Sequence, residues 1–269
     1  MRTHHRVESG RAVLAAEVVG SGDPVVFLHA RVADRRMWRE QLDGVGINNK
    51  AIAYDRRGFG ETHADDENFS AIADLMAVID AMANGKRAIL VGCSQGGGIA
   101  LEAALRHPSS FRALVLIAPN VTGAPEATGS PEIDSLRVQL KEAEKIGDID
   151  QAITLRTRLS LDGPLEQEGR VVGPARQLFI DMNSVALRTP PIGANLDIAP
   201  AYPRLREISM PSLVICGDLD FPMTQERSRY VATMVLNGTY HELSGTAHLP
   251  SLERPAHVTG LITEFISRC

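Results

Sequence analysis

Short apolar runs alternate with amphipathic stretches along most of this chain. The stretches between the runs carry apolar residues at steps of three and four, the spacing of a helix with one buried face. This alternation predicts an α/β fold in which a mostly parallel central sheet is flanked by crossover helices. The runs are rich in Val, Ile and Leu, and we expect strands at 13–19, 25–29, 51–55, 87–92, 113–118, 212–217 and 239–243.

The clearest helical pattern lies between the third and fourth runs. Ile72, Leu75, Ile79 and Met82 recur on one face, and Gly85 ends the pattern. Similar patterns predict helices at 99–106, 224–234 and 256–266. The polar segment at the start of the chain, which includes His4 and His5, is expected to be disordered.

The alternation breaks between about residues 131 and 206, where no strand pattern occurs. Apolar spacing instead predicts three helices, at 133–143, 153–161 and 178–185. Helices this short would hardly bury a core of their own. We therefore expect a helical lid at 121–206, inserted after about residue 120 into a single domain that spans 1–269.

Composition excludes several classes of protein. The chain has 269 residues, 44% of them hydrophobic and 23% charged, which is enough for a large core. No run approaches the roughly 18 apolar residues of a membrane helix, so we expect no membrane partner. The polar first residues lack the apolar stretch of a signal peptide, and we expect a cytoplasmic protein.

Charge and cysteine content narrow the choice further. The formal net charge is -5 without a long basic cluster, so a nucleic-acid partner is not expected. Three cysteines, two of them beside apolar runs, argue against a disulfide framework. His241-Glu242 resembles the start of a zinc-protease motif, but Gly245 stands where the second histidine should be, so we expect no metal.

The strongest chemical signal is the segment 92–96, Gly-Cys-Ser-Gln-Gly, which fits G-x-S-x-G. An apolar strand runs directly into it, and Gly97, Gly98 and a helical pattern follow. Such a tight strand-to-helix turn holds its serine in a strained conformation at the carboxyl edge of the strand. Ser94 is therefore the candidate nucleophile, whereas Cys93 is interpreted as a small buried apolar residue.

A serine nucleophile needs a histidine base and an acid that orients it. His248 lies in the loop between the last strand and the last helix, which favours it as the base. His29, by contrast, is expected to support its own loop. Asp218 and Asp220 both follow the strand at 212–217, and their spacing does not decide between them.

The order serine, aspartate, histidine, each after a strand, resembles that of the alpha/beta hydrolases. The resemblance extends over nearly the whole chain. It implies that Asp220, three positions after the strand-ending Gly217, is the acid, and that Asp218 braces a loop. The matching segments are 28–31, 55–60, the serine turn, 217–220, Ala247-His248 and 253–255.

The resemblance also implies an oxyanion site formed by the backbone N–H groups of Gln95 and Arg31. The chain departs from the family at one point, because Ala30 replaces the usual glycine of a His-Gly pair. Arg31 then places a long cation beside the pocket.

The expected reaction is hydrolysis of a small apolar carboxylic ester or lactone, without a cofactor. Ser94 would attack the carbonyl, His248 would move the proton, and Asp220 would hold the imidazole. Trp38, Phe179 and Met182 are candidate substrate contacts, although core packing explains them equally well. A homodimer is left open. Hydrolysis of a carbon–carbon bond in a diketone uses the same residues, and a non-catalytic small-ligand receptor is the alternative from another class.

Overall fold

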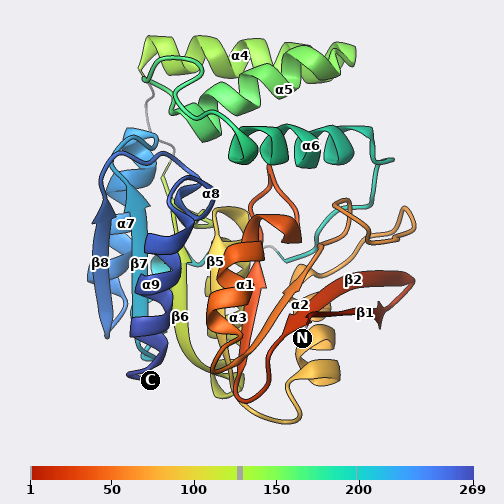
Figure 1. The fold of residues 1–269 in the computed structure, drawn as a ribbon, viewed down its shortest axis with the longest axis vertical. Helices are drawn as coiled ribbons and strands as arrows, with labels where there is room; N and C mark the ends of the chain where they lie inside the picture. Colours follow the sequence, from red (N-terminus) through yellow and green to blue (C-terminus); the bar gives the residue numbers. More distant parts are fainter. Residues whose placement is uncertain (1, 126–129, 198) are drawn as a thin grey trace.

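The centre of the molecule is an eight-stranded sheet, in a computed structural model that describes residues 2–125, 130–197 and 199–269 (Figure 1). The strand order is β1-β2-β4-β3-β5-β6-β7-β8, and all pairs from β4 to β8 are parallel. The mostly parallel sheet predicted from the apolar runs is thus confirmed. Its strands are β1 (Arg2–Ser9), β2 (Ala12–Val19), β3 (Pro24–Leu28), β4 (Lys50–Tyr54), β5 (Ala88–Cys93), β6 (Phe111–Ile117), β7 (Ser212–Gly217) and β8 (Gly238–Leu243).

The first strand corrects the prediction of a disordered start. β1, which contains His4 and His5, pairs antiparallel with β2 from Arg2 opposite Val19 to Ser9 opposite Ala12. As an edge strand it has one neighbour and leaves most of its side chains at least partly exposed, with Val7 buried. A polar edge strand of this kind carries little apolar signal, which is why the pattern missed it.

Helices cover both faces of the sheet. α1 (Arg39–Val45) and α9 (Pro255–Ile266) pack on the face that contains Phe27 and Val91, while α2, α3 and α7 pack on the face that contains Val26 and Leu90. Neighbouring strand residues therefore alternate between two cores, as the pleat of a strand requires. The remaining bounds are α2 (Ala71–Met82), α3 (Gln95–Arg106), α7 (Pro222–Met234) and α8 (Pro250–Glu253), with 3-10 turns at Arg35–Trp38, Pro108–Ser110 and Tyr202–Glu207.

A helical insertion separates β6 from β7, as the sequence predicts. It contains α4 (Pro131–Ile146), α5 (Ile149–Thr157) and α6 (Pro174–Arg188), and a π-helical turn at Arg158–Asp162 follows α5. The three helices lie together at one end of the molecule, at the top of Figure 1, beyond the ends of the strands. Within the described residues, no helix is both long and apolar enough to cross a membrane.

The three candidate substrate contacts, for which core packing was the equal alternative, lie in the core. Phe179 and Met182 of α6 are 0% and 1% exposed, and they pack with the core of the α1 and α9 face. Trp38 is also fully buried, with its ring centroid 5.3 Å from that of Phe27. Side chains buried to this degree leave no surface for a substrate, so the structure favours packing over substrate contact for all three.

This burial predicts a stability effect at Phe179. Phe179→Ala should lower the free energy of unfolding by about 3–5 kcal/mol, because it removes buried apolar surface and leaves a cavity. Chemical denaturation followed by circular dichroism measures the change. Val172→Ala, at an exposed position of the same insertion, is the control and should change stability by less than about 0.5 kcal/mol. A Phe179→Ala protein as stable as the unmodified chain would remove this residue from the core and return it to the candidate substrate contacts.

Candidate active site

Ser94 occupies the turn between β5 and α3, with φ 52° and ψ -114°. Left-handed φ values are costly for residues other than glycine, and they persist where the surroundings enforce them. Here Ser94 N–H donates to the Ile117 carbonyl at 2.9 Å, and the Asn120 N–H donates to the Ser94 carbonyl at 2.9 Å. The turn therefore has the strained geometry that the sequence predicts, and it leaves the serine partly exposed at the carboxyl edge of the sheet.

The glycines of the motif allow α3 to approach the sheet closely. A Cβ atom on Gly96 would lie 2.2 Å from the Leu28 carbonyl oxygen, and one on Gly92 would lie 2.5 Å from the Gly96 carbonyl oxygen. No side chain fits at either distance. These two positions hold the helix N-terminus against β3 and so determine where Ser94 stands.

Asp220 and His248 form a hydrogen-bonded pair. His248 Nδ1 lies 2.8 Å from Asp220 Oδ2 and 3.0 Å from Oδ1, and the Phe221 N–H donates to Oδ1 at 2.7 Å. Asp218 contacts the loop before His248 instead, accepting from Ser244 Oγ at 2.9 Å and from the Gly245 N–H at 2.7 Å. The structure thus places Asp220 against the imidazole and Asp218 in a loop-bracing position.

The loop that carries His248 lies beside the serine turn. The Sγ atom of Cys93, the residue before Ser94, is 3.8 Å from the His248 carbonyl oxygen. Among the described residues, no hydrogen bond joins Ser94 Oγ to His248 Nε2. Hydrogen bonds between a nucleophile and its base commonly tighten only when substrate binds.

The surroundings of His248 adjust its basicity. Burial disfavours the charged imidazole, but the charge and hydrogen bond of Asp220 outweigh this effect and raise the pKa of His248 above its ordinary value. Burial, together with the charge of Asp220, raises the pKa of the Cys93 thiol. The pair of pKa shifts favours proton uptake by the imidazole and disfavours a thiolate at Cys93.

His29 supports the loop after β3, as predicted. Its Nε2 accepts a hydrogen bond from the Arg56 N–H at 3.0 Å, and its Nδ1 lies 2.8 Å from the Ala30 carbonyl oxygen. Burial, and then the charge of Arg56, lower the pKa of His29 well below its ordinary value. A neutral His29 therefore links the loop after β3 to the loop after β4.

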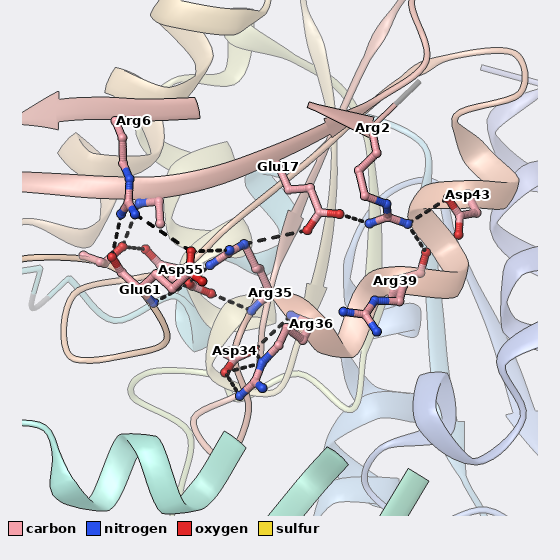
Figure 2. A network of polar contacts seen from close by, with 12 residues as sticks. Arg2, Arg6, Glu17, Asp34, Arg35, Arg36, Arg39, Asp43, Asp55 and Glu61 are labelled. Carbon is pink, nitrogen blue, oxygen red and sulfur yellow. Dashed lines mark hydrogen bonds and ion pairs between the residues drawn. The ribbon is translucent and has the colours of Figure 1, made fainter. Parts of the chain in front are cut away.

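A buried ion network, shown in Figure 2, fixes the same two loops. Asp55 accepts from the backbone N–H groups of Arg35 and Glu61, both at 2.8 Å, and pairs with the Arg35 guanidinium. That guanidinium also reaches Glu61 at 2.7 Å and Glu17 at 3.8 Å. Burial raises the pKa of Asp55 to about 6, against the effect of Arg35. The network holds the segment that carries Arg31 in place.

Gln95 and Arg31, the expected oxyanion donors, face a common space. Gln95 is the first residue of α3, where a backbone N–H has no acceptor within the helix and the helix dipole favours negative charge. Arg31 follows the Ala30 that replaces the usual glycine, and its side chain is exposed. Both residues line a cavity of about 340 Å³ between the sheet edge and the segment that follows α6.

One ion pair near the site cannot be predicted from the sequence. Arg170, in the insertion before α6, pairs with Glu253 and donates to the Gly245 carbonyl at 3.0 Å. Glu253 in turn accepts from the Ala247 N–H at 2.9 Å, next to His248. The insertion is thereby tied to the histidine loop by a pair 83 positions apart, which no local spacing rule connects.

The described residues contain no group of three or more histidine, cysteine or carboxylate side chains that could hold a metal ion.

Comparison with known proteins agrees with this architecture. A model of a family described as "Alpha/beta hydrolase family" matches residues 25–259. The 2-hydroxymuconate semialdehyde hydrolase of Pseudomonas sp. (strain CF600) is 26% identical, over 97% of this chain and 94% of that protein. A thermophilic esterase from Thermogutta terrifontis superposes with a TM-score of 0.76 at 23% identity, over 100% of this chain and 98% of that one. Esterase RhEst1 from Rhodococcus sp. ECU1013 superposes with a TM-score of 0.78 at 22% identity, over 99% and 98%.

The Asp220–His248 pair predicts a pH dependence. A general base must be neutral, so kcat/KM should fall as the pH drops through the pKa of His248, which lies above the ordinary value of about 6.5. Asp220→Asn removes the charge that raises this pKa, so the acid limb should move to lower pH. The same change should lower kcat by about 10⁴, because the imidazole loses control of its tautomer.

Asp218→Asn is the matched control, because it removes an aspartate two positions away that braces the loop. It should keep the acid limb in place and cost little activity. If Asp218→Asn were instead the variant that shifts the limb and loses activity, the roles of the two aspartates would be exchanged.

Proposed function

The chain belongs to the alpha/beta hydrolase family, and we propose that it is a serine hydrolase that cleaves a small carboxylic ester or lactone through an acyl-enzyme intermediate. One observation carries the proposal. The strained turn presents Ser94 at the sheet edge to which the Asp220–His248 pair also belongs. A nucleophile, a base and an orienting carboxylate on three separate loops are the components of acyl transfer.

Acylation begins when Ser94 Oγ attacks the carbonyl carbon and His248 Nε2 takes the hydroxyl proton. The carbonyl oxygen becomes an oxyanion, which accepts hydrogen bonds from the N–H groups of Gln95 and Arg31. Each such donor commonly contributes about 3 kcal/mol to the transition state. The intermediate collapses when the bond to the leaving oxygen breaks and His248 returns the proton to that oxygen.

Deacylation repeats the steps with water. His248 takes a proton from water as the oxygen attacks the acyl carbon, and the bond to Ser94 Oγ then breaks. The proton on His248 passes to Ser94, which restores the enzyme and releases the acid. Asp220 stays ionised throughout and stabilises the imidazolium that forms in both halves.

Hydrolysis of a carbon–carbon bond in a diketone is a second candidate. The relative from Pseudomonas is named for a semialdehyde rather than for an ester, and this name supports the second candidate. The same residues would act, with a carbanion in place of an alkoxide as the leaving group. Turnover of a panel of esters, lactones and diketones distinguishes the two reactions.

Replacing the nucleophile tests the proposal directly. Ser94→Ala should lower kcat for a 4-nitrophenyl ester by about 10⁴ to 10⁶, because the remaining groups cannot form the acyl-enzyme. The Cys93→Ala variant is the neighbouring control and should retain serine-dependent turnover. Steady release of 4-nitrophenol is expected from the unmodified protein. Release of a single equivalent, without turnover, would favour the ligand-binding receptor, and undiminished turnover by Ser94→Ala would exclude Ser94 as the nucleophile.

A further inference from the structure

Among the described residues, two arginines that line the cavity beside Gln95 have no carboxylate partner. Arg56 is 7% exposed, and its guanidinium donates to two neutral oxygens, Gln95 Oε1 at 2.9 Å and the His29 carbonyl at 3.1 Å. Its Nε is buried without a hydrogen-bond partner. In the part of the chain that the structure describes, Arg31 forms no ion pair. A buried cation without a counter-charge is costly, so Arg56 calls for an anion, and the exposed Arg31 can contact the same anion from the cavity wall.

Two neighbouring arginines, unlike Arg31 and Arg56, have carboxylate partners. Arg35 pairs with three carboxylates, and Arg57 pairs with Asp74 at 3.0 Å and with Glu67 at 2.9 Å. Asp55 stands next to Arg56 in the chain, but it is held by Arg35 and by two backbone N–H groups. Of the three arginines that line the cavity, Arg57 is thus paired, whereas Arg31 and Arg56 have no ion pair among the described residues. Burial, opposed in part by nearby acids, lowers the pKa of Arg56 to about 10, and the charge of Arg31 acts in the same direction.

Both unpaired guanidinium groups belong to one cavity. Arg31, Arg56 and Gln95 line the space of about 340 Å³, which is the size of a small-molecule site. Much of the remaining wall is apolar, and includes Phe59, Phe69, Ile99, Pro190, Pro191 and Ile192. Asp74 also lines it, but this carboxylate is engaged by Arg57. The cavity thus combines apolar walls with two cationic groups next to the expected oxyanion donors.

We propose that this cavity binds a carboxylate group of the substrate through the guanidinium groups of Arg31 and Arg56. The inference rests on the proposed function, and it narrows the substrate class to esters or lactones that carry a carboxylate. Because Arg31 and Gln95 are also the proposed oxyanion donors, the carboxylate and the scissile carbonyl would belong to one small molecule held in the same cavity. Planar guanidinium groups match carboxylate geometry and hold it through paired hydrogen bonds. This proposed substrate class differs from the apolar ester or lactone expected from the sequence.

Calorimetric titration with adipate, glutarate and butyrate tests the site without any turnover. Butyramide is the neutral match for butyrate and should bind at least about 10-fold more weakly. Arg31→Gln should weaken carboxylate binding by roughly 10- to 150-fold, the usual effect of losing a hydrogen bond to a charged group. Arg39→Gln removes the same charge from an exposed arginine outside the cavity lining, and its binding should stay within about twofold of the unmodified protein.

A second experiment measures whether the two arginines determine which ester the protein prefers. The mono-4-nitrophenyl ester of adipate should react with a kcat/KM at least about 10-fold above that of its methyl-capped, neutral counterpart. Arg31→Gln should abolish this preference, whereas Arg39→Gln should retain it. Arg56→Lys, which keeps the charge but loses the planar fork, should reduce the preference.

Three results would overturn the inference: equal binding of butyrate and butyramide, equal effects of the Arg31 and Arg39 changes, or no preference for the charged ester. Failure of the proposed function has a different signature. If carboxylates bind through Arg31 but no ester turns over in a Ser94-dependent way, the anion site stands and the hydrolase proposal falls. If neutral esters turn over and carboxylates do not bind, the anion site alone is lost.

Discussion

The site depends on one constraint, the close packing of α3 against β3 through glycines that no other residue can replace. At Gly96 a Cβ atom would lie 2.2 Å from a backbone oxygen of β3. This contact brings the helix N-terminus to the sheet edge, and the chain between β5 and α3 must then pass through the left-handed conformation of Ser94. The position of Ser94, and that of Gln95 at the start of α3 and on the cavity wall, both follow from that turn.

The charged residues around the turn fall into two groups, those with a partner of opposite charge and those without one. One group is internally balanced: Arg35 with its three carboxylates, and Asp220 with His248, hold loops in fixed positions. The other group is unbalanced, because Arg31 and Arg56 face a cavity without a carboxylate of their own. Balanced pairs contribute to the framework, whereas unbalanced charges are available to a ligand. One small region thus combines charges that support the loops with charges that we propose bind the substrate.

Much of this arrangement is readable in the sequence because its causes are local. Alternating apolar runs predict the parallel sheet, and the glycines around Ser94 predict the turn. β1 was missed because a polar edge strand has no apolar period, and its pairing with β2 depends on tertiary context. The burial of Phe179 and Met182 depends on which side of α6 faces the core, and the Arg170–Glu253 pair joins segments far apart in the chain. Neither is encoded in any local spacing.

The most direct test of the whole account is a crystal structure of the protein after reaction with a small fluorophosphonate, which mimics the tetrahedral intermediate. We expect the phosphorus bonded to Ser94 Oγ and the phosphoryl oxygen about 2.7–3.1 Å from the backbone nitrogens of Arg31 and Gln95. His248 Nε2 should lie within hydrogen-bond distance of Ser94 Oγ. A label on another residue, or a phosphoryl oxygen directed away from both nitrogens, would contradict the account.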